Sequence, residues 1–235
     1  MMDTDWRNFH RLSGYASFLL LALMIAYAVI IAFLGPQPTD ALSYFNLARQ
    51  SPIKALLVSD LNIPIALTAY FFIFLSLWKI LNELNRPLVA LASALTCMAV
   101  AFTILGNTDL ALIRLAKEYF ASNDARERQM IEAAGKALFA NNMWHSSAAY
   151  FCGIFMQGSG VLISLIMLKS KKFSRITAYS GIWGNGFDLA QHLIHLAFPS
   201  AAGILLKIAG PGYLVWYIFL GLDLLRNSKQ RETAS

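Results

Sequence analysis

Charged residues are sparse in this chain and leave long apolar stretches between them. A helix that crosses a membrane needs about 20 mostly apolar residues, and six stretches approach or exceed that length. The pattern therefore predicts an all-α fold, a six-helix transmembrane bundle that forms a single integral membrane domain over residues 1–235. The predicted helices cover about residues 14–34, 61–81, 87–108, 143–168, 176–197 and 201–225.

The first and last of these helices have distinct sequence features. The uncharged run from Gly14 to Leu34 is too long for the apolar part of a signal peptide, so we expect a permanent anchor. The sixth helix contains Gly210, Pro211 and Gly212, residues that favour turns. We expect it either to begin near Ala201 with a kink or to begin at Pro211, and an ordinary helix start at these residues is favoured over an unwound substrate site.

Two connections are predicted to contain helices of their own. Between the first two spans, we predict a short interfacial helix in the segment Thr39 to Ser59, broken by Pro52. Between the third and fourth spans, Ala111 to Asn142 combines charged residues with apolar residues at helical spacing. This segment predicts an amphipathic extracytoplasmic helix, in which Asp124 and Glu127 have the spacing of an N-cap and N3 pair.

The overall composition supports a membrane protein. Hydrophobic residues make up 57% of the chain, charged residues make up 14%, and the mean hydropathy is +0.54. These values exclude a disordered or fibrous chain. The net charge of +6 is spread over short clusters, so we expect membrane lipids as partners and no nucleic acid. Cys97 and Cys152 lie in apolar stretches, which excludes a disulfide framework.

Basic residues predict the orientation of the chain. An even number of spans places both termini on one side, and that side is richer in Lys and Arg than the other. The densest run comprises Lys169, Lys171, Lys172 and Arg175, between the fourth and fifth spans. Because basic residues are retained on the cytoplasmic side, both termini are predicted to be cytoplasmic.

Two motifs near the C-terminus resemble a known family. Residues Ser170 to Ile182 (SKKFSRITAYSGI) and Trp216 to Arg226 (WYIFLGLDLLR) are similar to the short fourth-to-fifth helix link and the closing helix of the bacterial family known as domain of unknown function 4386. The resemblance covers roughly the last 90 residues. It implies a six-helix protein of the bacterial inner membrane, and it implies no activity and no catalytic residues.

Polar residues gather in the fifth predicted helix. At about 100° per residue, one third of its circumference carries Asn185, Asp188, Gln191, His192 and His195. Ionisable groups inside a membrane are costly, so they usually face the bundle interior or a pathway. In the fourth helix, Gln157 is expected to form an interhelical hydrogen bond. In the sixth, Asp223 and Arg226 are expected to form an ion pair.

The predicted topology brings polar ends of other helices to the same leaflet. Asn107 and Asp109 end the third helix there, Asp60 and Asn62 begin the second, and Trp144 and His145 begin the fourth. We therefore predict an outward-facing polar pocket that binds or passes a small ligand. Its candidate residues are Asp188, His192, His195, His145, Asn185, Asp109 and Asn107.

Three alternatives to such a pocket remain open at this point. His145, His192 and His195 with Asp188 are a candidate set of metal ligands, with zinc as the metal. An intramembrane metal-dependent hydrolase acting on a lipid or amphiphile is therefore one alternative. Haem or quinone binding through His145 and His192 is another. In the third, the polar groups simply satisfy one another.

Overall fold

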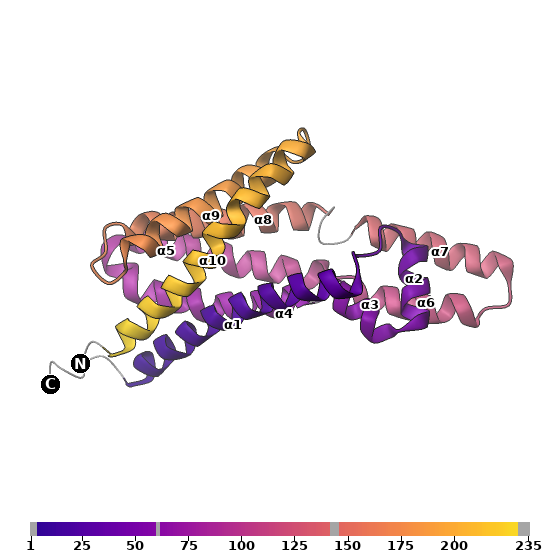
Figure 1. Cartoon of the computed structure of the whole chain (residues 1–235), viewed down its shortest axis with the longest axis horizontal. Coiled ribbons are helices and arrows are strands. Elements are labelled where there is room, and N and C mark those ends of the chain that lie inside the picture. The colour runs from indigo at the N-terminus through magenta and orange to yellow at the C-terminus, as the bar shows by residue number, and fades with distance from the viewer. Residues whose placement is uncertain (1–3, 60–61, 142–145, 230–235) are drawn as a thin grey trace. The chain divides into compact units, whose positions relative to one another are not determined.

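The computed structural model describes residues 4–59, 62–141 and 146–229, and within these residues it contains helices and no strand (Figure 1). The predicted all-α class is therefore confirmed. The helices are α1 (Thr4–Leu34), α2 (Ala41–Gln50), α3 (Pro52–Val58), α4 (Asn62–Leu67), α5 (Ala69–Gly106), α6 (Asp109–Ala121), α7 (Ala125–Ala140), α8 (Ser147–Met167), α9 (Arg175–Ile194) and α10 (Pro199–Lys229).

Four helical stretches of the described chain are long and apolar enough to cross a membrane. They are Thr4–Leu34, Ile63–Ala121, Ser147–Met167 and Pro199–Lys229. The second of them includes both the second and the third predicted spans. The fifth predicted span corresponds to α9, which is not among the four because its polar residues lower its hydropathy. The fold is thus that of a helical membrane protein with four such stretches, where the sequence predicted six spans.

Helix α5 consists of two segments. Its 38 residues would extend about 57 Å as one straight helix, which is nearly twice the roughly 30 Å of a bilayer core. Asn85 leaves the helical conformation at φ −159° and ψ 81°, and its side chain accepts a hydrogen bond from the Leu88 N–H at 3.2 Å. Pro87 lies in the first turn that follows, where it is tolerated. The predicted break between residues 81 and 87 is therefore confirmed.

The chain forms two compact units. The first comprises residues 1–22, 67–101 and 151–235, and the second comprises residues 23–66 and 102–150. The boundaries fall inside α1, α4, α5 and α8 rather than in linkers. They therefore do not mark separable domains along the chain.

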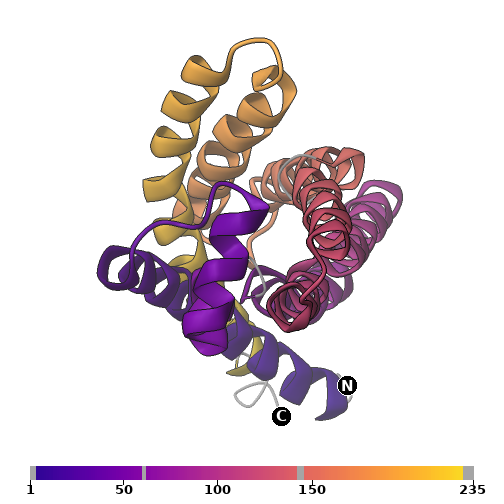
Figure 2. The same ribbon diagram turned by 90° about the vertical axis from the view of Figure 1, so that its right-hand side faces the viewer.

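The core of the first unit joins apolar residues of α1, α5, α8, α9 and α10. Its largest fully buried side chains include Leu20, Phe74, Ile163 and Trp216. Helices α9 and α10 lie side by side as a hairpin, seen as the orange and yellow pair in Figures 1 and 2. Their backbones meet at Gly184 and Gly212, where a methyl group on Gly212 would lie 2.7 Å from the Gly184 nitrogen. Such close approach of helices is typical of small residues in membrane proteins.

Two helix boundaries differ from the prediction. Helix α10 runs unbroken from Pro199 to Lys229, so of the two expected starts the one near Ala201 lies within two residues of the structure and the one at Pro211 is wrong. A proline inside a helix removes one backbone hydrogen bond, and neighbouring helices can compensate for this loss in a membrane protein. The α9 backbone lies directly beside α10 at the next residue, Gly212. The first helix begins at Thr4 rather than Gly14, because its charged and polar first turns are also helical.

The second unit contains the short helices that the connections predicted. Helices α2 and α3 are separated by Ser51, and Pro52 is the first residue of α3, so the predicted break at Pro52 is confirmed. The expected amphipathic helix is instead two helices, α6 and α7, because the chain is extended between them. Asp124 caps α7 by accepting the Arg126 N–H at 2.9 Å. Glu127 accepts the Ser122 hydroxyl rather than closing a capping box on Asp124.

Candidate functional site

The polar residues of helix α9 face the interior of the first unit. Its N-cap, Ser174, accepts the Thr177 N–H at 3.1 Å and fixes where the helix begins. Asn185 and Asp188 are then 1% and 7% exposed, and the His192 side chain is 17% exposed. The opposite side carries exposed apolar residues, namely Trp183, Phe187 and Leu193. The predicted polar face is thus a buried face.

Glycines of α8 make room for two of these polar residues. A methyl group on Gly153 would lie 2.2 Å from the His192 ring, and one on Gly160 would lie 2.0 Å from the Asn185 side chain. The two glycines and the two polar residues are each seven positions apart, which is close to two helical turns. The His192 ring and the Asn185 amide therefore lie directly against the α8 backbone.

Asp188 lies at the centre of a polar cluster that we define as Asp188, His192, Tyr213 and Gln157, the Asp188 cluster. The Tyr213 hydroxyl lies 2.8 Å from Asp188 Oδ2 and 2.6 Å from Gln157 Oε1. Asp188 Oδ1 is buried and has no hydrogen-bond partner among the described residues. His192 Nε2 is 3.6 Å from Oδ1, which is longer than a hydrogen bond.

The Asp188 cluster contains more hydrogen-bond acceptors than donated hydrogens. A tyrosine hydroxyl carries one hydrogen, so Tyr213 can donate to Asp188 or to Gln157 but not to both. The two carboxylate oxygens of Asp188 and the amide oxygen of Gln157 therefore face a single donated hydrogen. A buried acceptor without a donor is costly, so the cluster is suited to an additional group that donates hydrogen bonds.

Tyrosines extend this polar region toward other helices of the first unit. The Tyr213 ring stacks on Tyr217 with centroids 5.9 Å apart. The Tyr217 hydroxyl is hydrogen-bonded to that of Tyr70 on α5, and the Tyr217 carbonyl accepts the Ser17 hydroxyl of α1 at 2.8 Å. Sequence reasoning missed Tyr70, Tyr213 and Tyr217. Their signal was a hydroxyl in the middle of an apolar helix, since buried tyrosine hydroxyls usually find partners.

The predicted site residues fall into three groups. Asn185, Asp188 and His192 share the buried face of α9. His195 is the C-cap of α9, where its Nδ1 is 2.9 Å from the His192 carbonyl and its ring is 6.2 Å from the His192 ring. In the second unit, the Asn107 amide donates to Asp109 at 2.8 Å. These two residues thus bond to each other.

His145 lies outside the described residues, and so do Asp60 and Trp144. Within residues 4–59, 62–141 and 146–229, no three His, Cys, Asp or Glu side chains are grouped as a metal ion would require. Three predictions depended on His145 or on a site with three metal ligands. They are the zinc site, the haem or quinone site and the metal-dependent hydrolase. They remain predictions from the sequence.

Two other predictions are confirmed by the contacts. Gln157 of α8 accepts the Tyr213 hydroxyl of α10, which is the interhelical hydrogen bond expected for it. Asp223 and Arg226 form the expected ion pair at 3.4 Å. The Asp223 carboxylate also bonds α9, a role that its spacing from Arg226 did not indicate.

Searches with protein-family models, against curated protein sequences and against solved structures give no match. The resemblance to the family known as domain of unknown function 4386 therefore remains a prediction from the two motifs. The function has to be argued from the site itself.

Proposed function

We propose that this chain is a multi-pass protein of the bacterial inner membrane, with six membrane-spanning helices and both termini in the cytoplasm. The four long apolar stretches support a membrane location. The break at Asn85 supports two spans within α5, and the 20-residue length of α9 supports one more. The basic residues of the α8–α9 link favour a cytoplasmic position for that link. The predicted amphipathic segment, here α6 and α7, then lies on the outer side.

We also propose that the chain belongs with the bacterial family that its two C-terminal motifs resemble. Both motifs fall on structural junctions of the first unit. Ser170 to Ile182 covers the link that leads into α9, and Trp216 to Arg226 covers the last turns of α10. These segments bond each other through Asp223. The contact between them gives a structural reason for the two motifs to occur together.

The proposed activity is binding or passage of a small ligand at the Asp188 cluster. The observation that carries this proposal is the buried Asp188 Oδ1, which lacks a hydrogen-bond partner within the described chain. Ionisable groups in membrane helices usually mark a ligand or ion pathway. A carboxylate that served packing alone would be expected to have both oxygens bonded.

The chemistry of the cluster defines the kind of ligand. Three acceptor oxygens, from Asp188 and Gln157, share one tyrosine hydrogen. A ligand with several N–H or O–H donors and a positive charge would satisfy the remaining acceptors and balance the carboxylate. A small ammonium compound has these properties. A carboxylate ligand would add acceptors and repel Asp188.

The route to the cluster runs along the C-terminal end of α9. His192 follows Asp188 by one turn, and His195 follows His192 by nearly another. Both imidazole rings are partly exposed, whereas the residues of the same face that precede Asp188, namely Gly181, Gly184 and Asn185, are buried. In the proposed orientation this end faces the outside of the cell, so the ligand enters from there.

Cysteine accessibility tests the route. In a background with Cys97→Ser and Cys152→Ser, the variants His192→Cys and His195→Cys are treated in intact cells with a membrane-impermeant methanethiosulfonate reagent. Both are expected to react, with His195→Cys the faster. Ile163→Cys, at a fully buried position of α8, is the control and should stay unlabelled. Absence of labelling at both histidine positions would overturn the proposed route.

Protection by small solutes tests the ligand chemistry. Methylammonium, which carries three N–H donors, is expected to slow labelling of His192→Cys. Acetate has a similar size and only acceptors, so it should give no protection. Adding Asp188→Asn should abolish the protection by methylammonium. Equal protection by both solutes, or protection that survives Asp188→Asn, would contradict a donor ligand at Asp188.

A further inference from the structure

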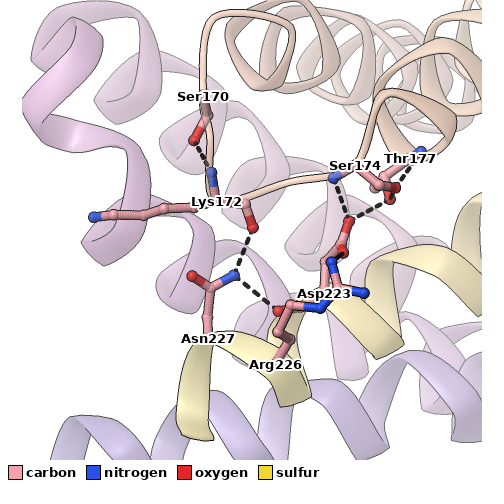
Figure 3. Close-up of polar contacts among 7 residues, drawn as sticks. All are labelled: Ser170, Lys172, Ser174, Thr177, Asp223, Arg226 and Asn227. Carbon is pink, nitrogen blue, oxygen red and sulfur yellow. Dashed lines mark hydrogen bonds and ion pairs between the residues drawn. The ribbon is translucent and has the colours of Figure 1, made fainter. Parts of the chain in front are cut away.

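The α8–α9 link is held in place by side chains of α10, as Figure 3 shows. Asp223 Oδ2 accepts the Ser174 N–H at 2.7 Å and the Thr177 hydroxyl at 2.6 Å. The Asn227 amide donates to the Lys172 carbonyl at 2.8 Å. Within the link, the Lys172 N–H bonds the Ser170 hydroxyl at 3.1 Å. The backbone of the link is therefore fixed relative to α9 and α10.

This fixed link carries a concentrated positive charge. Lys169, Lys171, Lys172 and Arg175 lie within seven positions, and all four are exposed. The nearby Asp223 carboxylate is buried and already accepts the donors of α9. Glu83 lies 3.8 Å from the Lys172 ammonium, and its side chain is 80% exposed. Neither acid therefore neutralises more than one of the four cations.

Membrane topology explains the number of these charges but not their fixed positions. Basic residues orient a membrane protein by their count in a loop, and a flexible loop would serve equally well. Here Asn227 bonds the backbone of one of the basic residues, and Phe173 beside it is buried. The backbone positions of the four basic residues are therefore fixed at the ends of two helices. Such an arrangement is suited to recognising a specific anionic group.

We propose that the α8–α9 link is a binding site for the headgroup of an anionic phospholipid. The lipid phosphate is held by Lys169, Lys171, Lys172 and Arg175, and its acyl chains lie along the apolar surfaces of the neighbouring helices. Clusters of basic residues at the cytoplasmic ends of membrane helices commonly bind anionic lipids. In the same unit, the Lys79 ammonium lies 5.1 Å from the centre of the Trp6 ring. Tryptophan is typical of the membrane interface, which supports a headgroup-level position for this end.

Lipid titration of the detergent-purified full chain tests the proposal. Dioleoylphosphatidylglycerol and dioleoylphosphatidylcholine are added separately, and bound lipid is counted by native mass spectrometry. The wild type is expected to bind the anionic lipid at least about tenfold more tightly than the zwitterionic one. The quadruple variant Lys169→Gln, Lys171→Gln, Lys172→Gln and Arg175→Gln should lose this preference. The control variant removes four cations of the second unit, with Lys54→Gln, Lys117→Gln, Arg126→Gln and Lys136→Gln, and should keep it.

Asn227→Ala separates a fixed site from a mere concentration of charge. It leaves all four cations in place and removes the bond to the Lys172 carbonyl, so binding of phosphatidylglycerol should weaken several-fold. Unchanged binding would overturn the claim of a fixed site, and equal losses in the quadruple and control variants would overturn its location. Glycerol 3-phosphate is the remaining probe. Should it bind as tightly as the lipid, the site would be one for free phosphate esters and the lipid proposal would fail.

Discussion

The first unit contains two buried carboxylates that differ in how they are bonded. Asp223 is 1% exposed, and its Oδ2 accepts two short hydrogen bonds from α9 while Oδ1 pairs with Arg226. Asp188 is 7% exposed, shares one tyrosine hydrogen with Gln157, and has an Oδ1 without a hydrogen-bond partner in the described residues. Burial alone does not distinguish these two acids.

The difference separates a structural role from a functional one. Asp223 compensates the cost of its burial by accepting the Ser174 N–H and the Thr177 hydroxyl at the start of α9, where a negative charge is also favoured by the helix dipole. Asp188 retains unused bonding capacity at a place where each unmet acceptor is costly. Removing Asp223 should therefore reduce stability, whereas neutralising Asp188 should affect ligand binding.

The largest effect is expected for Asp223→Ala. The substitution leaves the Ser174 N–H and the Thr177 hydroxyl without their acceptor, and hydrogen bonds to charged groups each contribute about 1.5–3 kcal/mol. We expect a loss of about 2–4 kcal/mol in the free energy of unfolding, measured by denaturant titration in detergent. Arg226→Ala is the control, because the Arg226 side chain is 60% exposed and the Asp223 carboxylate keeps its two bonds at the start of α9 without it, so the loss should be about 1 kcal/mol or less. Equal losses in both variants would contradict the assigned role.

A second, smaller effect is expected for Gly153→Ala. The added methyl group would lie 2.2 Å from the His192 ring, so the ring must move away from Asp188, at a cost of about 1–3 kcal/mol. Gly158 lies on the same helix and has no atom within 4 Å of its added methyl. Gly158→Ala should therefore stabilise α8 slightly through better helix propensity. A stable Gly153→Ala variant with unchanged labelling at His195→Cys would show that His192 does not depend on this contact.

These contacts show how far the sequence could predict the fold and the site. Charge spacing located the helical stretches and the break near Asn85, because the apolar length of a span is set by the bilayer. Helical periodicity placed Asn185, Asp188 and His192 on one face. Periodicity depends only on positions along one helix, so these predictions needed no knowledge of neighbouring helices.

The remaining features depend on contacts between distant segments. Tyr213 joins Asp188 and Gln157 from a helix 25 residues away from Asp188, and nothing in the spacing of these residues indicates that pairing. The close approach of α10 to α9 at Gly212 and Gly184, directly after Pro211, is another contact of this kind. The bond from the α9 N-cap, Ser174, to Asp223 also joins residues 49 positions apart. Local patterns cannot specify such pairs, because helix packing selects them.

The third prediction concerns Asp188→Asn. An amide costs less to bury than a carboxylate and adds two N–H donors to a site with too few. The free energy of unfolding should therefore stay the same or rise by up to about 1 kcal/mol, while methylammonium protection is lost. Destabilisation as large as that of Asp223→Ala would place Asp188 among the structural carboxylates, and the distinction between the two acids would disappear.

The smallest effect is expected for Asp40, which caps α2 at the surface, whereas the buried Asp223 accepts the N–H of the α9 N-cap, Ser174. Its side chain accepts the Ser43 hydroxyl at 2.6 Å and the Ser43 N–H at 2.9 Å, and these bonds lower the pKa of the Asp40 carboxyl below its ordinary value. Because the pKa is lower in the folded state, the cap stabilises the fold above the unfolded-state pKa of about 4. This stabilisation is lost as the pH falls through the folded-state value.

Asp40→Ala should therefore cost about 0.5–1 kcal/mol in the free energy of unfolding at neutral pH. The difference from wild type should vanish in acid, as measured by denaturant titration across that pH range. A difference that persisted in acid would show that the charge of an exposed cap does not contribute, unlike that of the buried one.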